Sequence, residues 1–384
     1  MLKSKFSIAY SVFIASILLT FGLVVWLQSV SPVRVAEAVG LIDDSLSDFE
    51  LGSGCFVAQS SGAAFNGEVI VSPTIGTNFS GTALPLNWFT TGSGPVTVAD
   101  GLLTVDQDRT GPLPPRFSPG RVLEFVATFT QTTDQHIGFG QFLQDITETW
   151  AIFSTRADGA QLWARTNDAT SETLTPLGTG YFSQTHLYRV EWGTSSITYT
   201  IDGVGVATHT VQIAATMRPQ IMDSNAPGDA LTVDWLRMSD FSPSPCTFTS
   251  RVIDSGLDGS TFTGLSTTLV TPAGTAIAFE VITSTNNVDW GTWTAVNFDG
   301  SFSAGAARYM RYRAGLSTSE AQSTPQLQSV TVHGYGPPPT AVRVTSFSVS
   351  GTDFAPRALL IGLSGVVLAV GGVSVIFRRR RIAN

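Results

Sequence analysis

The stretch 186-HLYRVEWGTSSITYTIDGVGVATHT-210 decides the fold class of this 384-residue chain. Ile197, Tyr199 and Ile201 alternate with threonines, which is the period-two pattern of a strand with one buried face. Asp202-Gly203 follows directly, and this pair is typical of a tight hairpin turn. The segment therefore predicts an antiparallel β-hairpin.

Strand patterns of this kind recur along the middle of the chain, and helical periodicity is nearly absent there. Turn clusters such as Ser93-Gly94-Pro95 and Ala157-Asp158-Gly159 separate the strand-like runs. These runs include 121-RVLEFVATFT-130, 276-AIAFEVITST-285 and 308-RYMRYRA-314. Many short strands with turns between them predict an all-β protein built of sandwiches or jelly rolls.

The two ends differ from the middle and predict hydrophobic helices. Residues 1–30 hold an apolar run after two lysines, which indicates a signal peptide or a membrane anchor. Residues 358–377 form a second apolar run, and the four arginines of 378–381 follow it directly. This layout predicts a transmembrane helix with a cytoplasmic basic tail, preceded by a linker over 337–356.

The part between the ends is acidic and is expected on the outer side of the membrane, at the cell surface. It carries a net charge of about −15, because 7 of the 21 basic residues lie in the terminal segments. Nucleic acid is excluded as a partner, since its phosphates need a basic face. Cys55 and Cys246 both lie in this exported part and have no neighbouring cysteine or histidine to complete a zinc site. They predict a disulfide.

Residues 76–240 resemble a concanavalin A-like lectin/glucanase domain. Four landmarks occur in the order found in laminarinase- and lichenase-type glucanases: 79-FSGTALPLNW-88, 119-PGRVLEFVATF-129, the hairpin quoted above and 233-VDWLRM-238. The second departs from the family pattern, since Glu124 follows Gly120-Arg121 after two positions instead of one. The resemblance implies a concanavalin A-like β-sandwich.

Residues 244–336 resemble the jelly-roll-like β-sandwich modules of bacterial surface proteins. The matching pieces include 250-SRVIDSG-256, 271-TPAGTAIAFEV-281 and 325-PQLQSVTV-332. Such modules commonly begin with a strand that reads like residues 49–73, which here precede the lectin-like domain. The resemblance implies a concanavalin A-like sandwich inserted in, or followed by, a jelly-roll-like sandwich. The disulfide would then clamp the neck of the inserted domain.

Retaining glycosidases need two carboxyl groups about 5–5.5 Å apart, which the glucanases carry as E-x-D-x-E or E-x-D-x-x-E on one strand. The corresponding stretch is 139-FGQFLQDITETW-150, where Gln144 and Ile146 share the face of Glu148 and Asp145 points away. The motif is absent, so no catalytic residue is assigned. No G-x-S-x-G, H-E-x-x-H or phosphate-loop motif replaces it.

A structural calcium ion is implied by the resemblance alone. In many glucanases of this fold, the Asp of the closing strand helps to bind calcium, and Asp234 would take that role here with backbone carbonyls as further ligands. The alternative is a capping or exposed strand residue.

The hairpin 148-ETWAIFSTRADGAQLWARTN-167 supplies the candidate ligand-binding residues. If it closes at Asp158-Gly159, facing residues have numbers that sum to 317. Trp150 and Trp163 then share one face with Arg165 and Glu148, a mixture suited to stacking on a sugar and binding its hydroxyls. Asn167 is a weaker candidate. The alternative is that the tryptophans pack under a loop or against the other domain.

The sequence therefore indicates a membrane-anchored cell-surface protein whose ligand is a polysaccharide or cell-surface glycan, bound for recognition or adhesion without catalysis. Two alternatives stay open. One is a glycoside hydrolase or transglycosylase whose acids come from elsewhere in the chain. The other is a purely structural envelope protein.

Overall fold

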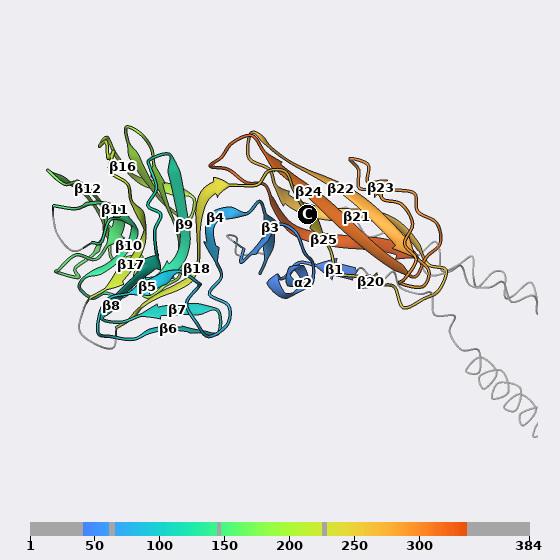
Figure 1. Cartoon of the computed structure of the whole chain (residues 1–384), viewed down its shortest axis with the longest axis horizontal. Coiled ribbons are helices and arrows are strands. Elements are labelled where there is room, and N and C mark those ends of the chain that lie inside the picture. Colours follow the sequence, from blue (N-terminus) through green and yellow to red (C-terminus); the bar gives the residue numbers. More distant parts are fainter. Residues whose placement is uncertain (1–40, 61–65, 144–146, 225–228, 336–384) are drawn as a thin grey trace, which may run out of the picture. The chain divides into compact units, whose positions relative to one another are not determined.

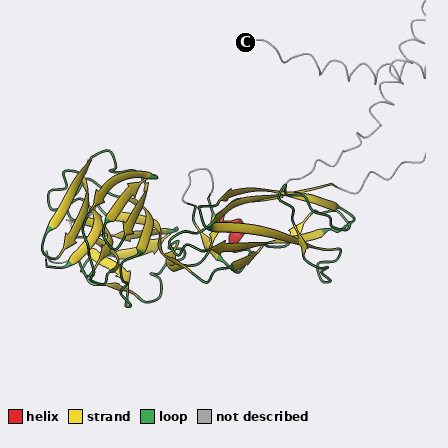
Figure 2. Ribbon diagram, turned by 90° about the horizontal axis from the view of Figure 1, so that it is seen from above, coloured by secondary structure: helices red, strands yellow, loops and turns green. Residues whose placement is uncertain are grey.

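The computed structural model describes residues 41–60, 66–143, 147–224 and 229–335, and within them it is almost entirely β-structure. The one helix of this part is the short α2 (Leu46–Glu50), red in Figure 2 among the yellow strands. The expected all-β class is confirmed. Both terminal apolar segments, together with Gln144, Asp145 and Ile146, lie outside the described residues. No helix within the described ranges is long and apolar enough to span a membrane.

The strands form four sheets, which pack as two sandwiches (Figure 1). We call the first the flanking sandwich, since its strands come from both ends of the described chain. One of its sheets holds β1 (Leu41–Asp43), β2 (Phe56–Ala58), β3 (Glu68–Ile70), β21 (Thr261–Val270) and β25 (Gln326–Tyr335). The other holds β19 (Cys246–Thr249), β20 (Ile253–Asp254), β22 (Thr275–Ser284), β23 (Thr294–Ala295) and β24 (Tyr309–Thr318).

The second, or central, sandwich uses the chain between β3 and β19. Its eight-stranded sheet holds β4 (Pro73–Thr77), β6 (Val96–Ala99), β7 (Leu102–Val105), β9 (Arg121–Thr128), β14 (His186–Trp192), β15 (Ile197–Ile201), β16 (Val204–His209) and β18 (Leu231–Phe241). Its seven-stranded sheet holds β5 (Trp88–Thr90), β8 (Asp108–Pro112), β10 (Gln135–Gly140), β11 (Thr149–Ser154), β12 (Leu162–Asp168), β13 (Glu172–Gly178) and β17 (Arg218–Asp223). The chain thus leaves the flanking sandwich after β3 and returns to it at β19. The jelly-roll type of the flanking sandwich stays a prediction.

Each sandwich has its own apolar core between its sheets. In the central sandwich, Phe125 and Tyr188 of the eight-stranded sheet stack at 5.3 Å, and Phe153 of the opposite sheet meets Tyr188 edge-on at 4.9 Å. In the flanking sandwich, Phe248 and Tyr312 pack beside Val330 of the other sheet. These large side chains are fully buried, so their transfer from water stabilises each sandwich separately.

The two hairpins expected from the sequence are present. β15 and β16 join at Asp202-Gly203, where φ is +50° and +78°, the left-handed conformation that a tight hairpin turn requires. In the second hairpin, Ser154 pairs with Trp163 and Trp150 with Asn167, which is the expected register. Its turn is wider than two residues, because residues 155–161 lie outside both strands.

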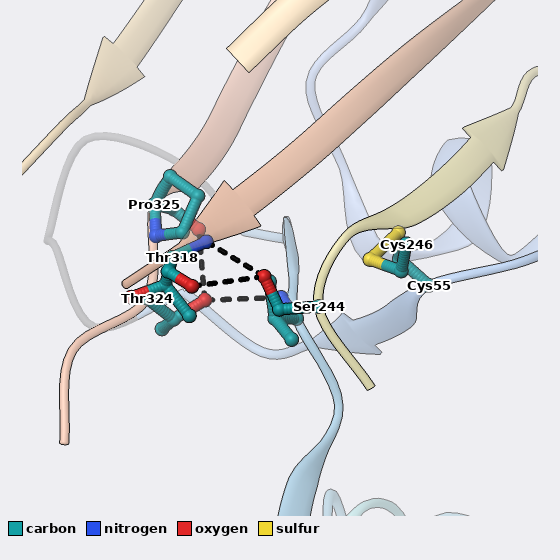
Figure 3. The surroundings of a disulfide bond; sticks show 7 residues. Cys55, Ser244, Cys246, Thr318, Thr324 and Pro325 are labelled. Carbon is teal, nitrogen blue, oxygen red and sulfur yellow. Dashed lines mark hydrogen bonds between the residues drawn. A yellow bond between two sulfur atoms is a disulfide. The ribbon is translucent and has the colours of Figure 1, made fainter. Parts of the chain in front are cut away.

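Cys55 and Cys246 form the expected disulfide, with Cα atoms 5.5 Å apart (Figure 3). Cys246 begins β19 and Cys55 directly precedes β2, so the bond links the two sheets of the flanking sandwich. Beside it, Ser53 and Thr249 exchange two backbone hydrogen bonds of 2.9 and 2.8 Å. The whole central sandwich lies in the sequence between the two cysteines.

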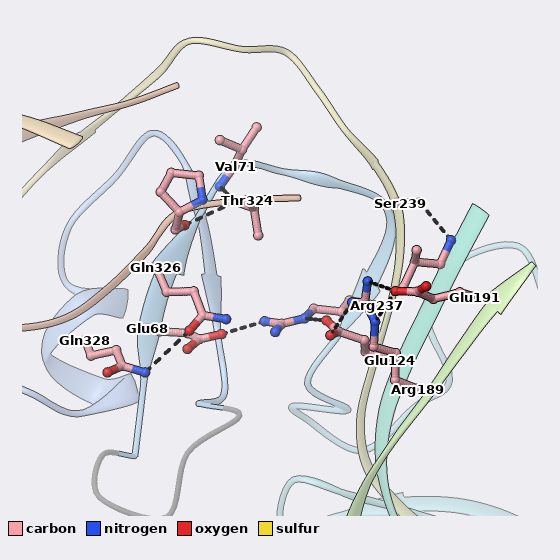
Figure 4. Close-up of polar contacts among 12 residues, drawn as sticks. Glu68, Val71, Glu124, Arg189, Glu191, Arg237, Ser239, Thr324, Gln326 and Gln328 are labelled. Carbon is pink, nitrogen blue, oxygen red and sulfur yellow. Dashed lines mark hydrogen bonds and ion pairs between the residues drawn. The ribbon is translucent and has the colours of Figure 1, made fainter. Parts of the chain in front are cut away.

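A buried ion-pair network runs from β3 of the flanking sandwich to β18, β9 and β14 of the central one (Figure 4). Arg237 pairs with Glu68 and also, at 2.7 Å, with Glu124, which in turn pairs with Arg189 at 2.7 Å. The side chains of Glu68 and Arg237 are 0% and 3% exposed. Burial by itself would raise the pKa of Glu124, but Arg237 and Arg189 outweigh it and hold that pKa below its usual value.

Candidate functional site

The outer face of the seven-stranded sheet, turned away from the core, carries the candidate residues. Because side chains alternate along a strand, the pairing of neighbouring strands shows which residues share this face. They form three rungs across the sheet. The middle rung is Phe89, Gly111, Gln220, Gly138, Ile152, Arg165 and Leu174. One neighbouring rung is Arg109, Met222, His136, Ser154, Trp163 and Pro176, and the other is Arg218, Gly140, Trp150, Asn167 and Glu172.

Glycines leave the centre of this face with few side chains, so the backbone itself is its surface. Gly111 and Gly138 flank Gln220 on the middle rung, and Gly140 lies on the next one. A Cβ atom at Gly138 would lie 2.3 Å from the carbonyl oxygen of Ala151, and one at Gly111 would lie 2.5 Å from that of Pro219. No other residue fits there without movement of the backbone. The surrounding large side chains therefore rise above a floor of main chain.

The three rungs hold no carboxylate pair. Glu172 is their single acid, and Arg165 holds it in an ion pair of 2.6 Å. Asp134 lies beside the same face. It precedes Gly140 by six residues, and Gly140 is on the same rung as Glu172. At about 3.3 Å per residue the two acids are separated by about 20 Å along the strand direction alone, far beyond the 5–5.5 Å of a retaining pair.

A cavity of about 440 Å³ opens on this face around Trp150. Asp134 is the one acid among its lining residues, which are Asp134, His136, Leu143, Trp150, Ile152, Arg156, Ala157, Arg165, Met222 and Ser224. The indole N–H of Trp150 is buried and has no acceptor among the described residues. Apolar walls with a few polar groups are typical of small-ligand sites.

Trp150 and Trp163 share the outer face, as the register requires, and neither belongs to the core between the sheets. They do not form a bare platform. Trp150 is only 6% exposed and packs with Leu143 and Ile152, while the guanidinium of Arg165 lies 5.5 Å from the centre of its ring. Arg156 lies in the same way over Trp163, at 5.0 Å. Cation–π contacts thus cover part of both rings.

His136 forms the polar floor of the cavity. Its Nδ1 lies 2.8 Å from the hydroxyl of Ser154, which also accepts a hydrogen bond of 3.0 Å from Arg165. Burial, reinforced by the charge of Arg165, lowers the pKa of His136 to about 3. The imidazole is therefore neutral at physiological pH and offers hydrogen bonds rather than charge.

Arg165 and Glu148, expected beside the tryptophans, have structural partners. Arg165 is held by Glu172 and Ser154 and still lines the cavity. Glu148 precedes β11, and its carboxylate accepts a hydrogen bond of 3.1 Å from the backbone N–H of Phe142. Asn167 donates to the backbone carbonyl of Glu148 at 2.6 Å. Glu148 and Asn167 thus fix the approach to β11.

A second cavity, of about 640 Å³, lies over β5, β8 and β17 on the same side of the sheet. Its lining residues are Phe89, Thr91, Leu113, Pro114, Arg116, Phe142, Thr216 and Arg218. None of them was predicted from the sequence to bind a ligand. Its two arginines, Arg116 and Arg218, are brought together only by strand pairing and by the loop at Phe142. The basic residues that bracket 109-RTGPLPPR-116 were the one available signal.

Asp234 lies on β18 at a bulge, where the pairing with β9 skips from Val233 to Trp235. Burial raises the pKa of its carboxyl group. The described residues contain no group of three or more acidic, His or Cys side chains that could hold a metal. Backbone carbonyls would have to supply the other calcium ligands. Calcium here stays a prediction, supported if EDTA lowers the melting temperature and contradicted if it does not.

Comparisons with known proteins give structural likenesses only. No family model matches the chain, and no curated protein does. Similar solved structures include a beta-1,3-glucanase from Mycobacterium marinum, at 12% identity and a TM-score of 0.35 over 44% of this chain and 98% of that one. An immunostimulatory antigen and pseudo beta-1,3-glucanase of Mycobacterium tuberculosis has 13% identity and a TM-score of 0.35, over 43% and 98%. The endo-beta-1,3-glucanase from Pyrococcus furiosus has 10% sequence identity and a TM-score of 0.35, over 45% of this chain and 94% of that one. Likenesses this weak carry no argument about activity.

Proposed function

We propose that the outer face of the seven-stranded sheet binds a glycan chain without hydrolysing it. The observation that carries this proposal is the cavity around Trp150, which combines polar groups on an apolar wall with a buried indole whose N–H has no acceptor among the described residues. Its volume of about 440 Å³ lies in the range of small-ligand sites, about 300–1,000 Å³. A sugar offers C–H groups to such a wall and hydroxyls to His136, Arg156 and Asp134.

The expected lack of hydrolysis is supported by the acids of the described residues on this face. Glu172 is neutralised by Arg165, and Asp134 lies too far from it to share a substrate bond. The full chain should therefore release no reducing sugar from laminarin or lichenan. Turnover that disappears in Glu148→Gln or Asp134→Asn would contradict this and favour the hydrolase alternative.

A glycan array with the full chain, kept in detergent, tests binding itself. The proposal expects a restricted set of polysaccharides to be retained, and competed off by the same free glycan. No retention of any glycan would contradict the proposal and leave the structural alternative.

A cell-surface location with a C-terminal membrane anchor is part of the same proposal. It is supported by the apolar run 358–377 and the arginines 378–381. Removal of residues 358–384 should move the protein from the membrane fraction to the medium. A truncated protein that stays with the membrane would contradict the anchor.

A further inference from the structure

Three arginines surround one aromatic ring beside the proposed glycan site. The guanidinium carbons of Arg109, Arg116 and Arg218 lie 5.7, 4.8 and 5.4 Å from the centre of the Phe142 ring. Arg109 and Arg218 come from β8 and β17, and Arg116 from the loop after β8. Positive charge is thus concentrated on a protein whose exported part is strongly acidic.

The carboxylates of Glu148 and Asp108 compensate part of the charge of Arg109, whereas Arg116 and Arg218 are poorly compensated by the protein. Arg109 donates to the carbonyl of Phe142 and, at 2.9 Å, to the hydroxyl of Thr91. Arg116 and Arg218 form no side-chain hydrogen bond or ion pair with any of the described residues. Arg218 is only 3% exposed, and its buried Nε–H has no acceptor there. A buried guanidinium without partners is costly, since each unmet donor has lost its water.

The cavity places these donors beside apolar surface. Arg116 and Arg218 line it together with Phe89 and Phe142, and Phe142 is 39% exposed. Guanidinium groups bind carboxylates and sulfates with charge-assisted, often bidentate, hydrogen bonds. Exposed aromatic rings suit the C–H face of a sugar. The combination matches a sugar residue that carries a negative charge.

We propose that this cavity, which we call the arginine pocket, binds an anionic residue of the glycan, through a carboxylate or sulfate held by Arg116 and Arg218. This rests on the proposed glycan-binding function and narrows its ligand to acidic polysaccharides. Arg109 contacts the same Phe142 ring but is not among the residues that line the pocket. The acidic surface elsewhere opposes binding only weakly, because physiological salt screens charges beyond about 8 Å.

Burial, together with the charges of Arg116 and Arg109, lowers the pKa of Arg218. A bound anion between these groups would relieve the mutual repulsion. The guanidinium of Arg218 also lies 4.5 Å from the ring centre of Phe89, a cation–π contact that holds it at the cavity wall. The donors are therefore preorganised for a ligand.

The test compares polymers that differ in charge. The full chain is titrated with polygalacturonate, its methyl ester, dextran sulfate and dextran. We expect one charged polymer to bind at least about tenfold more tightly than its neutral counterpart, as loss of a charge-assisted contact implies. The charged polymer that binds identifies carboxylate or sulfate as the anion. Equal affinity for a charged polymer and its neutral counterpart would overturn the inference and leave glycan binding intact. Failure of both charged polymers to bind would also overturn it, and the glycan array then decides separately whether the proposed function holds.

Variants locate the binding. Arg116→Gln and Arg218→Met should reduce affinity for the acidic polymer to that for the neutral one, with folding checked by circular dichroism. Arg308→Gln, a partly exposed arginine of the flanking sandwich paired with Asp254, is the control and should bind as the wild type does. All variants keep the arginines 378–381, so binding to that tail would persist in every one. Undiminished binding by Arg116→Gln would overturn the assignment even if Arg218→Met fails to fold.

Discussion

At the scale of single residues, His136 gives the sharpest pH dependence. Its pKa is lowered to about 3 in the fold, mainly by burial, whereas an unfolded histidine titrates near 6.5. Between these values the unfolded state binds a proton that the folded state does not, so stability is present above about pH 6.5 and is lost as the pH falls. From pH 6 to 4 this residue should cost about 1.4 kcal/mol per pH unit.

The substitution His136→Asn, which can keep a hydrogen bond to Ser154, should remove this contribution. Urea unfolding at several pH values between 4 and 6.5 would then give a shallower slope of unfolding free energy against pH for the variant. Parallel slopes for the two proteins would contradict the buried neutral imidazole.

Residue patterns in the sequence determined which face the tryptophans share but not how exposed they are. Trp150 and Trp163 follow from strand parity and a turn centred on Asp158-Gly159. The guanidinium groups over their rings come from Arg165 and Arg156, whose side-chain directions no pattern specifies. The arginine pocket was missed for the same reason, since Arg109 and Arg218 meet only through the pairing of β8 with β17.

At the scale of elements, the low floor between β8, β17 and β10 depends on glycine. Gly138→Ala would place a Cβ atom 2.3 Å from the carbonyl oxygen of Ala151 on β11. We expect a loss of about 1–3 kcal/mol in unfolding free energy, since backbone must shift to admit it. Gly205→Ala in β16, with no atom within 4 Å of the added Cβ, should change stability by less than about 0.5 kcal/mol. Equal effects in chemical denaturation would contradict this packing.

The pairing of β3 with β18 through Glu68 and Arg237 gives a second prediction at this scale. Arg237→Met would leave Glu68 fully buried without its cation, and Glu124 with Arg189 as its one remaining partner, at a cost of about 3–5 kcal/mol. Arg189→Met leaves Glu124 paired with Arg237, and Arg189 is 28% exposed, so about 1 kcal/mol is expected. Similar losses of stability for the two variants in thermal unfolding would contradict this, because the buried ion pair of Arg237 would then contribute no more than the partly exposed ion pair of Arg189.

At the scale of the whole molecule, the disulfide constrains the unfolded chain across about half of its length. The two cysteines are 191 residues apart, for which loop-closure entropy gives roughly 5 kcal/mol as an upper figure. The double substitution Cys55→Ser and Cys246→Ser should therefore lower the unfolding free energy by about 2–5 kcal/mol. If reduction and the double substitution both leave the melting temperature unchanged, the constraint is not stabilising.

The sequence predicted the all-β class and the disulfide because each depends on short-range or compositional signals. Alternation and turn residues act within one hairpin, and two cysteines allow one intrachain pairing. The pairing of β1, β3 and β21 with β25 joins segments from opposite ends of the described chain. Such long-range contacts depend on the packing of complete sheets, which local patterns do not determine.

Glycan binding at the cavity around Trp150 is tested most directly by isothermal titration calorimetry with the glycan best retained on the array. The full chain is compared with its Trp150→Phe and Trp290→Phe variants. Trp150 lines the cavity, and its N–H has no acceptor in the part of the chain that the structure describes, whereas Trp290 lies in the flanking sandwich beside Arg311. We predict that Trp150→Phe weakens binding by on the order of 1 kcal/mol or more, while Trp290→Phe binds as the wild type does. Unchanged affinity in a correctly folded Trp150→Phe protein, or an equal loss in both variants, would contradict a glycan site on the seven-stranded sheet.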